Sequence, residues 1–177
     1  MTNIWNKDFI WHNAETKKKI EVYWDDIPVV GIGLFIYGAA GTGKTTIAVS
    51  LARWWKYRSP ISRVVGYDFF DILSAIKTLP EYRDLKQNAT LWNLQNSKYD
   101  LLVIDDFGAG RITDAAADTV ETMIRTWEKK GTIVIFTTNV HPDKIVETFN
   151  EQLWSRICGM TAYIEIEGKD WRTARKG

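Results

Sequence analysis

Short apolar runs alternate with longer amphipathic segments from Leu34 onward. The clearest run, Leu101–Ile104, is apolar without alternation, which is typical of a central strand in a parallel sheet. Sheets of this kind are built from βα units and carry helices on both faces. The pattern therefore predicts an α/β domain in which a parallel sheet is the middle layer of a three-layer sandwich.

Five segments are predicted to form the strands of this sheet. They are Leu34–Tyr37, Arg63–Tyr67, Leu101–Ile104, Thr132–Phe136 and Ala162–Glu167. In the last segment apolar side chains alternate with Tyr or Glu, so we expect that strand to be half exposed at an edge of the sheet.

Three helices are predicted from apolar spacing and from their ends. Residues 44–56 have helical spacing, and Asp68 is placed to cap a second helix that ends before Pro80. Thr113 is the expected N-cap of the best-marked helix, which closes at Lys129-Lys130-Gly131.

Length and composition suit one compact domain, because 177 residues of which 45% are hydrophobic can bury a core of their own. Residues 1–30 differ from the rest in their three consecutive lysines and scattered aromatics. We expect an N-terminal arm at 1–30 and a core domain at 31–177. The arm could dock on a partner, pack over adenine, bridge subunits or simply cover the core.

Charge and cysteine content restrict partners and location. Lys plus Arg (23) nearly balance Asp plus Glu (22), so any contact with nucleic acid must be local or shared between subunits. The single Cys158 cannot form an internal disulfide, and the first residues do not resemble a signal peptide. No apolar run reaches the roughly 20 residues needed to cross a bilayer. We expect a cytoplasmic protein with no membrane contact.

A G-x-x-x-x-G-K-T pattern between a predicted strand and a predicted helix indicates a loop that binds ATP. Its glycines let backbone N–H groups wrap the phosphates, and the helix adds its positive end. Lys44 is expected to reach the β and γ phosphates, and Thr45 to ligate Mg²⁺. A structural glycine turn is the alternative, but the flanking elements argue against it. The predicted nucleotide-binding residues are Gly38, Ala39, Ala40, Gly41, Thr42, Gly43, Lys44, Thr45 and Thr46.

Two acids, Asp105 and Asp106, follow the apolar strand Leu101–Ile104. Open α/β sheets bind ligands at the carboxyl ends of their strands, and a phosphate-bound Mg²⁺ needs a carboxylate there. We assign Asp105 to the metal and Asp106 to the general base that polarises the attacking water. A solvated strand end or a helix cap is the alternative.

Asn139 follows another predicted strand, expected between the loop strand and the acidic strand, where its amide could orient water near the γ-phosphate. A new helix starts in Asn139-Val-His-Pro142, so Asn139 could instead serve partly as a cap. Arg156 on its own is most simply a solvated residue on a helix.

Taken together, the motifs resemble those of the AAA+ ATPases, within them the DnaC/IstB group of helicase loaders and transposition helper ATPases. Tyr99–Gly108 is similar to the second nucleotide motif of that group, which ends in two aspartates, a hydrophobic residue and glycine. Phe136–Asn139 resembles its sensor-1 strand end, and Leu153–Ile157 resembles the segment that holds its arginine finger. The resemblance covers about Gly33 to Arg172.

This resemblance implies a P-loop NTPase fold of the AAA+ type with a five-stranded parallel sheet, the loop strand central, and a lid that is absent or reduced to Gly168–Gly177. It implies that Arg156 enters a neighbouring subunit's site, so that hydrolysis requires a homo-oligomer with shared ATP sites. Arg172 would stand near the phosphates as a sensor-2 substitute. Loaders of this group carry a sizeable N-terminal domain that grips the helicase, whereas this chain has about thirty residues before its core.

Single-stranded DNA could be bound by the aromatic and basic run Arg53–Arg58, because bases stack on exposed aromatic rings. Trp54 and Trp55 also have helical spacing, so at least one of them should belong to the core. By family analogy Arg111 and Lys86–Asn96 face a central channel, where small contributions from each subunit add up along one strand.

The sequence therefore predicts an oligomeric AAA+ ATPase that hydrolyses ATP with Mg²⁺ and acts on DNA, as a replicative helicase loader or a related replication or transposition factor. A replicative helicase or a transposase-like protein is the expected protein partner. The alternatives are a P-loop kinase of a small molecule and an assembly module that uses ATP with little hydrolysis.

Overall fold

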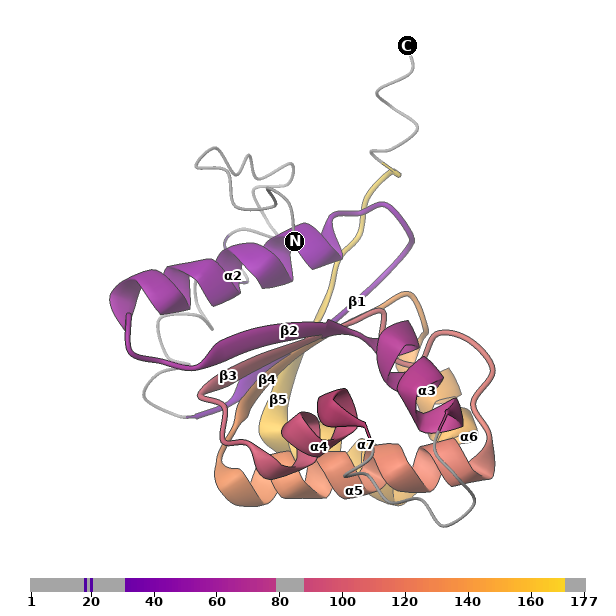
Figure 1. Cartoon of the computed structure of the whole chain (residues 1–177). Helices are drawn as coiled ribbons and strands as arrows, with labels where there is room; N and C mark the ends of the chain where they lie inside the picture. Colours follow the sequence, from indigo (N-terminus) through magenta and orange to yellow (C-terminus); the bar gives the residue numbers. More distant parts are fainter. Residues whose placement is uncertain (1–17, 19, 21–30, 79–87, 171–177) are drawn as a thin grey trace.

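A five-stranded parallel sheet forms the middle of the molecule (Figure 1). The computed structural model describes Lys18, Ile20, residues 31–78 and residues 88–170. The strands are β1 (Gly33–Tyr37), β2 (Val64–Asp68), β3 (Leu101–Asp105), β4 (Ile133–Thr138) and β5 (Thr161–Glu165). They are ordered β2-β3-β4-β1-β5 and every pairing is parallel. The predicted fold class is confirmed.

The helices lie on both faces of the sheet, α2 on one and α3 to α7 on the other, which makes three layers (Figure 1). They are α2 (Lys44–Arg58), α3 (Phe69–Lys77), α4 (Ala89–Asn96), α5 (Asp114–Lys130), α6 (Pro142–Thr148) and α7 (Glu151–Met160). Alternate residues of β1 serve the two layers, because Leu34 and Ile36 join the cluster under α2 while Phe35 joins the larger cluster on the other face. All three side chains are fully buried.

Strand positions follow the predicted pattern with one correction. β5 is an edge strand, and Tyr163 on it is exposed, as the alternation predicts. β4 lies between β1 and β3, which also agrees with the prediction. The loop strand β1 has neighbours on both sides, but the middle strand of the five is β4.

Two of the predicted helix caps are observed, and the alternative role of Asn139 as a cap is not. The Asp68 carboxylate accepts from the N–H of Phe70, and the Thr113 hydroxyl accepts from the N–H of Ala116. The helix after β4 is capped by His141 and not by Asn139, because Pro142 occupies its first position. The alternative interpretation of Asn139 as a cap is therefore excluded.

The helix α4 lies within Lys86–Asn96, for which only a DNA-facing surface was predicted. Asn88 caps it, and Leu91 and Leu94 are fully buried. The Trp127 indole N–H donates to the Leu94 carbonyl oxygen at 2.8 Å, which ties α4 to α5. In this part of Lys86–Asn96, α4 packs on the core through Leu91 and Leu94, while residues 79–87 lie outside the described residues.

The two tryptophans of α2 were predicted to include at least one core residue. Trp54 and Trp55 are half-buried against the α2-side cluster, so both contribute to the core, as expected of at least one.

Within the predicted N-terminal arm, Ile20 is buried in the same cluster, and residues 1–17, 19 and 21–30 lie outside the described part. Among the described helices, none combines the length and apolar character that a membrane span requires.

Candidate nucleotide-binding site

The predicted phosphate loop occupies residues 38–43, between the end of β1 and the start of α2. Gly38, Gly41 and Gly43 have φ values of 144°, 74° and 94°. Residues with a Cβ rarely adopt such values, so the glycines of the motif are required by the backbone path. The loop delivers the chain directly to the N-terminus of α2, where unpaired N–H groups and the helix dipole favour an anion.

The Lys44 ammonium closes this loop. Its Nζ donates to the carbonyl oxygens of Gly38 at 2.9 Å and Ala39 at 2.6 Å, and the Thr42 hydroxyl donates to the same Ala39 oxygen at 2.9 Å. The side chain is only 4% exposed. A buried ammonium requires acceptors, and phosphate oxygens could replace the loop carbonyls in that role.

The two predicted metal ligands are in direct contact. Thr45 Oγ1 donates to Asp105 Oδ1 at 2.9 Å, which joins the first turn of α2 to the end of β3. A hydroxyl and a carboxylate beside a phosphate loop are the hard oxygen donors that Mg²⁺ prefers, so the residues present fit this ion. The ion would be held by Thr45 and Asp105.

Asp106 and Asn139 also lie together, because β3 and β4 are neighbours. Asn139 Nδ2 donates to Asp106 Oδ1 at 3.3 Å. Asp106 has φ 51°, a left-handed conformation that turns the chain away from the strand immediately after Asp105. Because of this turn the two adjacent carboxylates have different partners: Asp105 contacts Thr45, and Asp106 contacts Asn139. Each carboxylate can therefore have a different chemical role.

Thr137, which the sequence analysis did not select, contacts both acids. Its hydroxyl donates to Asp105 Oδ1 and accepts from the Asp106 N–H at 3.1 Å. In the sequence Thr137 is one of two threonines that end the otherwise apolar strand β4, and the structure buries both of them fully.

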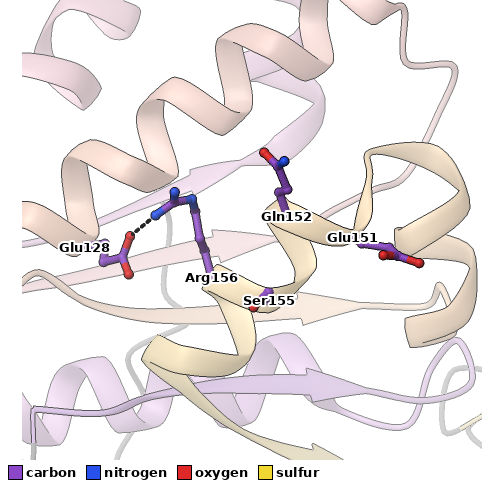
Figure 2. A pocket seen from close by; sticks show the side chains of 5 residues that line it. All are labelled: Glu128, Glu151, Gln152, Ser155 and Arg156. Carbon is purple, nitrogen blue, oxygen red and sulfur yellow. Dashed lines mark hydrogen bonds and ion pairs between the residues drawn. The ribbon is translucent and has the colours of Figure 1, made fainter.

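Arg156 is separated from these residues within its own chain. It lies on α7 and its Nη1 donates to Glu128 Oε2 of α5 at 2.8 Å, with one third of the arginine side chain exposed (Figure 2). The pair borders a shallow depression of about 510 Å³, whose lining residues are Glu128, Glu151, Gln152, Ser155 and Arg156. No residue of the phosphate loop lines it, and α5 and α7 lie on the face of the sheet opposite α2.

The start of α7 is fixed to α5 near this arginine. The Asn150 side chain accepts from the Leu153 N–H at 2.7 Å and donates to Glu121 Oε2 at 3.2 Å. Hydrogen bonds from Arg125 and then Asn150, together with the charges of Arg125 and Arg156, hold the pKa of the Glu121 carboxyl below its ordinary value. The Asn150 side chain thus joins the start of α7, the helix that carries Arg156, to α5.

The segment after β5 runs against the phosphate loop. The Ile166 N–H donates to the Tyr37 carbonyl oxygen at 2.8 Å, and a Cβ on Gly38 would lie 2.3 Å from the Ile166 carbonyl oxygen. A Cβ on Gly41 would lie 1.8 Å from Asp170 Oδ1, so the Asp170 carboxylate is in contact with the loop. No sequence motif indicated a role for Asp170. Arg172 lies outside the described residues, and Arg111 is exposed on the loop between β3 and α5.

The sheet order, the glycine loop and the contact between Thr45 and Asp105 define the class of P-loop nucleotide-binding proteins. Within this class, the family model described as "ATPase family associated with various cellular activities (AAA)" matches residues 34–159. This match spans most of the chain, and the protein belongs to the AAA family. Membership implies nucleotide binding and confirms the resemblance to AAA+ ATPases.

Solved structures with the same fold include proteins of replication. A DnaC helicase loader has a TM-score of 0.77 at 20% identity, covering 94% of this chain and 100% of that one. DnaI has a TM-score of 0.72 at 18% identity, covering 91% and 87%. Domain III of the Thermotoga maritima replication initiation protein DnaA has a TM-score of 0.74 at 22% identity, covering 93% and 67%. These identities establish a shared fold. A comparison with curated proteins gave no match.

Proposed function

We propose that this protein is an oligomeric ATPase that acts on DNA, as a replicative helicase loader or a related replication or transposition factor. The observation that carries the ATPase proposal is the 2.9 Å contact between Thr45 and Asp105, next to a lysine enclosed by the phosphate loop. This is the arrangement that a magnesium-bound nucleotide requires.

Different residues of the chain carry out different parts of the proposed reaction. Lys44 exchanges the carbonyls of Gly38 and Ala39 for phosphate oxygens, which the loop N–H groups also bind. A magnesium ion held by Thr45 and Asp105 supplies positive charge that offsets the charge of the phosphates. Asp106 accepts a proton from the attacking water while Asn139 holds its carboxylate. The products are ADP and phosphate.

The position of Arg156 supports a site shared between subunits. Its guanidinium lies in the α5–α7 layer and faces Glu128 and solvent, whereas the phosphate loop of the same chain precedes α2 on the other face. A neighbouring copy could therefore receive this arginine at its γ-phosphate, where the added charge accelerates hydrolysis. Under this proposal an isolated chain hydrolyses ATP slowly.

The DNA part of the proposal rests on the similar structures. One of them is a replication initiator DnaA bound to AMPPCP and single-stranded DNA, with a TM-score of 0.69 at 21% identity, covering 92% of this chain and 49% of that one. A DnaC helicase loader and a Streptococcus pyogenes protein described as a primosome component share the fold. We propose single-stranded DNA as the nucleic-acid ligand and a helicase or a transposase-like protein as the partner.

ATP hydrolysis as a function of protein concentration, with and without single-stranded DNA, tests this proposal. The samples are wild type, Arg156→Ala, Asp106→Asn and an equal mixture of the two variants. Each variant alone should be inactive. The mixture should recover activity, because a chain with an intact Asp106 then meets a neighbour with an intact Arg156.

Arg125→Ala is the matched control, since it removes an exposed arginine from the same layer and should retain activity. Hydrolysis that is proportional to concentration and indifferent to Arg156→Ala would refute the shared site. A hydrolysis rate unaffected by single-stranded DNA in every sample would count against the proposal that the protein acts on DNA.

A further inference from the structure

The Thr137 hydroxyl stands where the two acidic residues of the site diverge. Thr137 is fully buried on β4, the strand beside β3. Its Oγ1 is hydrogen-bonded both to Asp105 Oδ1 and to the backbone nitrogen of Asp106, the latter at 3.1 Å. One side chain thus contacts both the proposed metal carboxylate and the backbone of the proposed general base.

The directions of these two bonds follow from the groups involved. A backbone N–H can only donate, so the hydroxyl oxygen accepts the bond from Asp106. The single hydroxyl hydrogen is then available for Asp105, which as a carboxylate can only accept. The Thr137 hydroxyl thus uses its one donor and one of its two acceptor sites, and a side chain without a hydroxyl would leave both bonds unmade.

The backbone of Thr137 strengthens the same connection. Its carbonyl oxygen accepts from the Phe107 N–H at 2.7 Å, so β4 continues to hold the chain beyond the end of β3. Between these bonds Asp106 adopts φ 51°, which is uncommon for a residue with a side chain and requires support from its surroundings. The Thr137 hydroxyl and carbonyl provide that support on both sides of Asp106.

We propose that Thr137 is a positioning residue that fixes the Asp105 carboxylate for Mg²⁺ and the Asp106 backbone for water activation. This inference rests on the function proposed above. Thr45 also bonds Asp105, but Thr45 is itself a proposed ligand, whereas Thr137 orients the carboxylate from outside the ligand set. Groups that orient metal ligands in this way commonly affect metal affinity by about 10-fold or more when they are removed.

Thr138 offers a matched control from the adjacent position. It is equally buried, but its hydroxyl donates to the Phe107 carbonyl oxygen at 2.6 Å and accepts from the Val140 N–H at 2.9 Å. Those partners are backbone groups of the turns and neither is a carboxylate. A Thr→Val change therefore removes a buried hydroxyl at either position, yet only the change at 137 removes a bond to a proposed metal ligand.

The experiment measures binding of a fluorescent ATP analogue by the full chain, first in EDTA and then across a range of free Mg²⁺. Thr137→Val should bind the analogue in EDTA as wild type does, but its half-saturating Mg²⁺ concentration should rise about 10-fold. Thr137→Ser, which keeps the hydroxyl, should restore the wild-type Mg²⁺ dependence. Thr138→Val should also show the wild-type dependence, whatever its effect on melting temperature.

The outcomes separate this inference from the proposed function. If wild type fails to bind the analogue, or binds it without any response to Mg²⁺, the proposed ATPase function fails. If wild type responds to Mg²⁺ and Thr137→Val responds identically, only the role of Thr137 is overturned. Should Thr137→Val lose its cooperative melting transition, Thr137→Ala compared with Thr137→Ser decides the same question.

Discussion

The Thr45 hydroxyl reaches the Asp105 carboxylate across 60 positions of sequence, at 2.9 Å. The two residues belong to α2 and β3, which are not consecutive along the chain. Their contact arises because β3 and β1 flank β4 with parallel directions, so the loop after β1 and the end of β3 meet at the same edge of the sheet.

Lys44→Ala should abolish ATP binding, because the loop loses the ammonium that is proposed to bind the phosphates. The variant should also be less stable by roughly 1–3 kcal/mol, since two loop carbonyls lose their donor. Titration calorimetry and thermal melting measure the two effects. Lys56→Ala is the control: Lys56 also donates to two carbonyl oxygens, those of Pro60 and Ser62, but at the far end of α2. It should retain ATP binding, and equal loss of binding in both variants would contradict the assignment.

Asp170→Asn should tighten ATP binding. The carboxylate lies against Gly41 of the loop, where it repels the phosphates that must approach. Neutralising one partly screened charge of this kind should be worth about 1 kcal/mol, or roughly fivefold in the dissociation constant. Glu167→Gln is the control, because Glu167 is an exposed acid of the same segment. An unchanged or weaker affinity of Asp170→Asn would show that the carboxylate does not oppose the nucleotide.

Glu128→Gln should shift the onset of hydrolysis to lower protein concentration. The ion pair with Glu128 competes with the neighbouring site for Arg156, and the exposed position of the pair means that its loss should change stability by about 0–1 kcal/mol. Steady-state hydrolysis at increasing protein concentration is the measurement. Glu147→Gln, an exposed acid on α6, should behave as wild type. Reduced hydrolysis in Glu128→Gln would instead make Glu128 a residue that orients the arginine.

Glu121 should contribute stability that depends on pH. Arg125 first, and then Asn150, lower the pKa of the Glu121 carboxyl from its ordinary value of 4.5. A lowered pKa in the folded state stabilises the fold above pH 4.5, and this stabilisation disappears as the pH falls through the folded-state pKa. Glu121→Gln should therefore melt below wild type at neutral pH, with a difference that vanishes in acid. A difference that is constant with pH would indicate a packing effect.

Local patterns were sufficient to predict the phosphate loop, the apolar strands and the caps at Asp68 and Thr113, because each depends on residues close in sequence. The position of Asp105 could be predicted in the same way, because Asp105 directly follows the apolar run Leu101–Ile104. The two-turn helix α4 was missed because Leu91 and Leu94 alone give too little periodicity, and its place depends on a hydrogen bond from the distant Trp127.

Contacts between distant segments account for the other omissions. Thr137 and Thr138 look identical in sequence, and only the strand order brings the hydroxyl of the first to Asp105 and that of the second to a turn. Asp170 lies on the loop because the chain leaves the edge strand β5 alongside β1. The pairing of Arg156 with Glu128 depends on the packing of α7 on α5, which no motif encodes.

The placement of the phosphate loop and Arg156 in different layers has a consequence for how an assembly is terminated. If each loop receives its arginine from the next copy, a chain of subunits that does not close leaves one end loop without a donor. A closed ring leaves none. An open assembly would therefore keep one site that hydrolyses ATP more slowly than the others. The number of slow sites relative to fast sites would then reveal whether the assembly has ends.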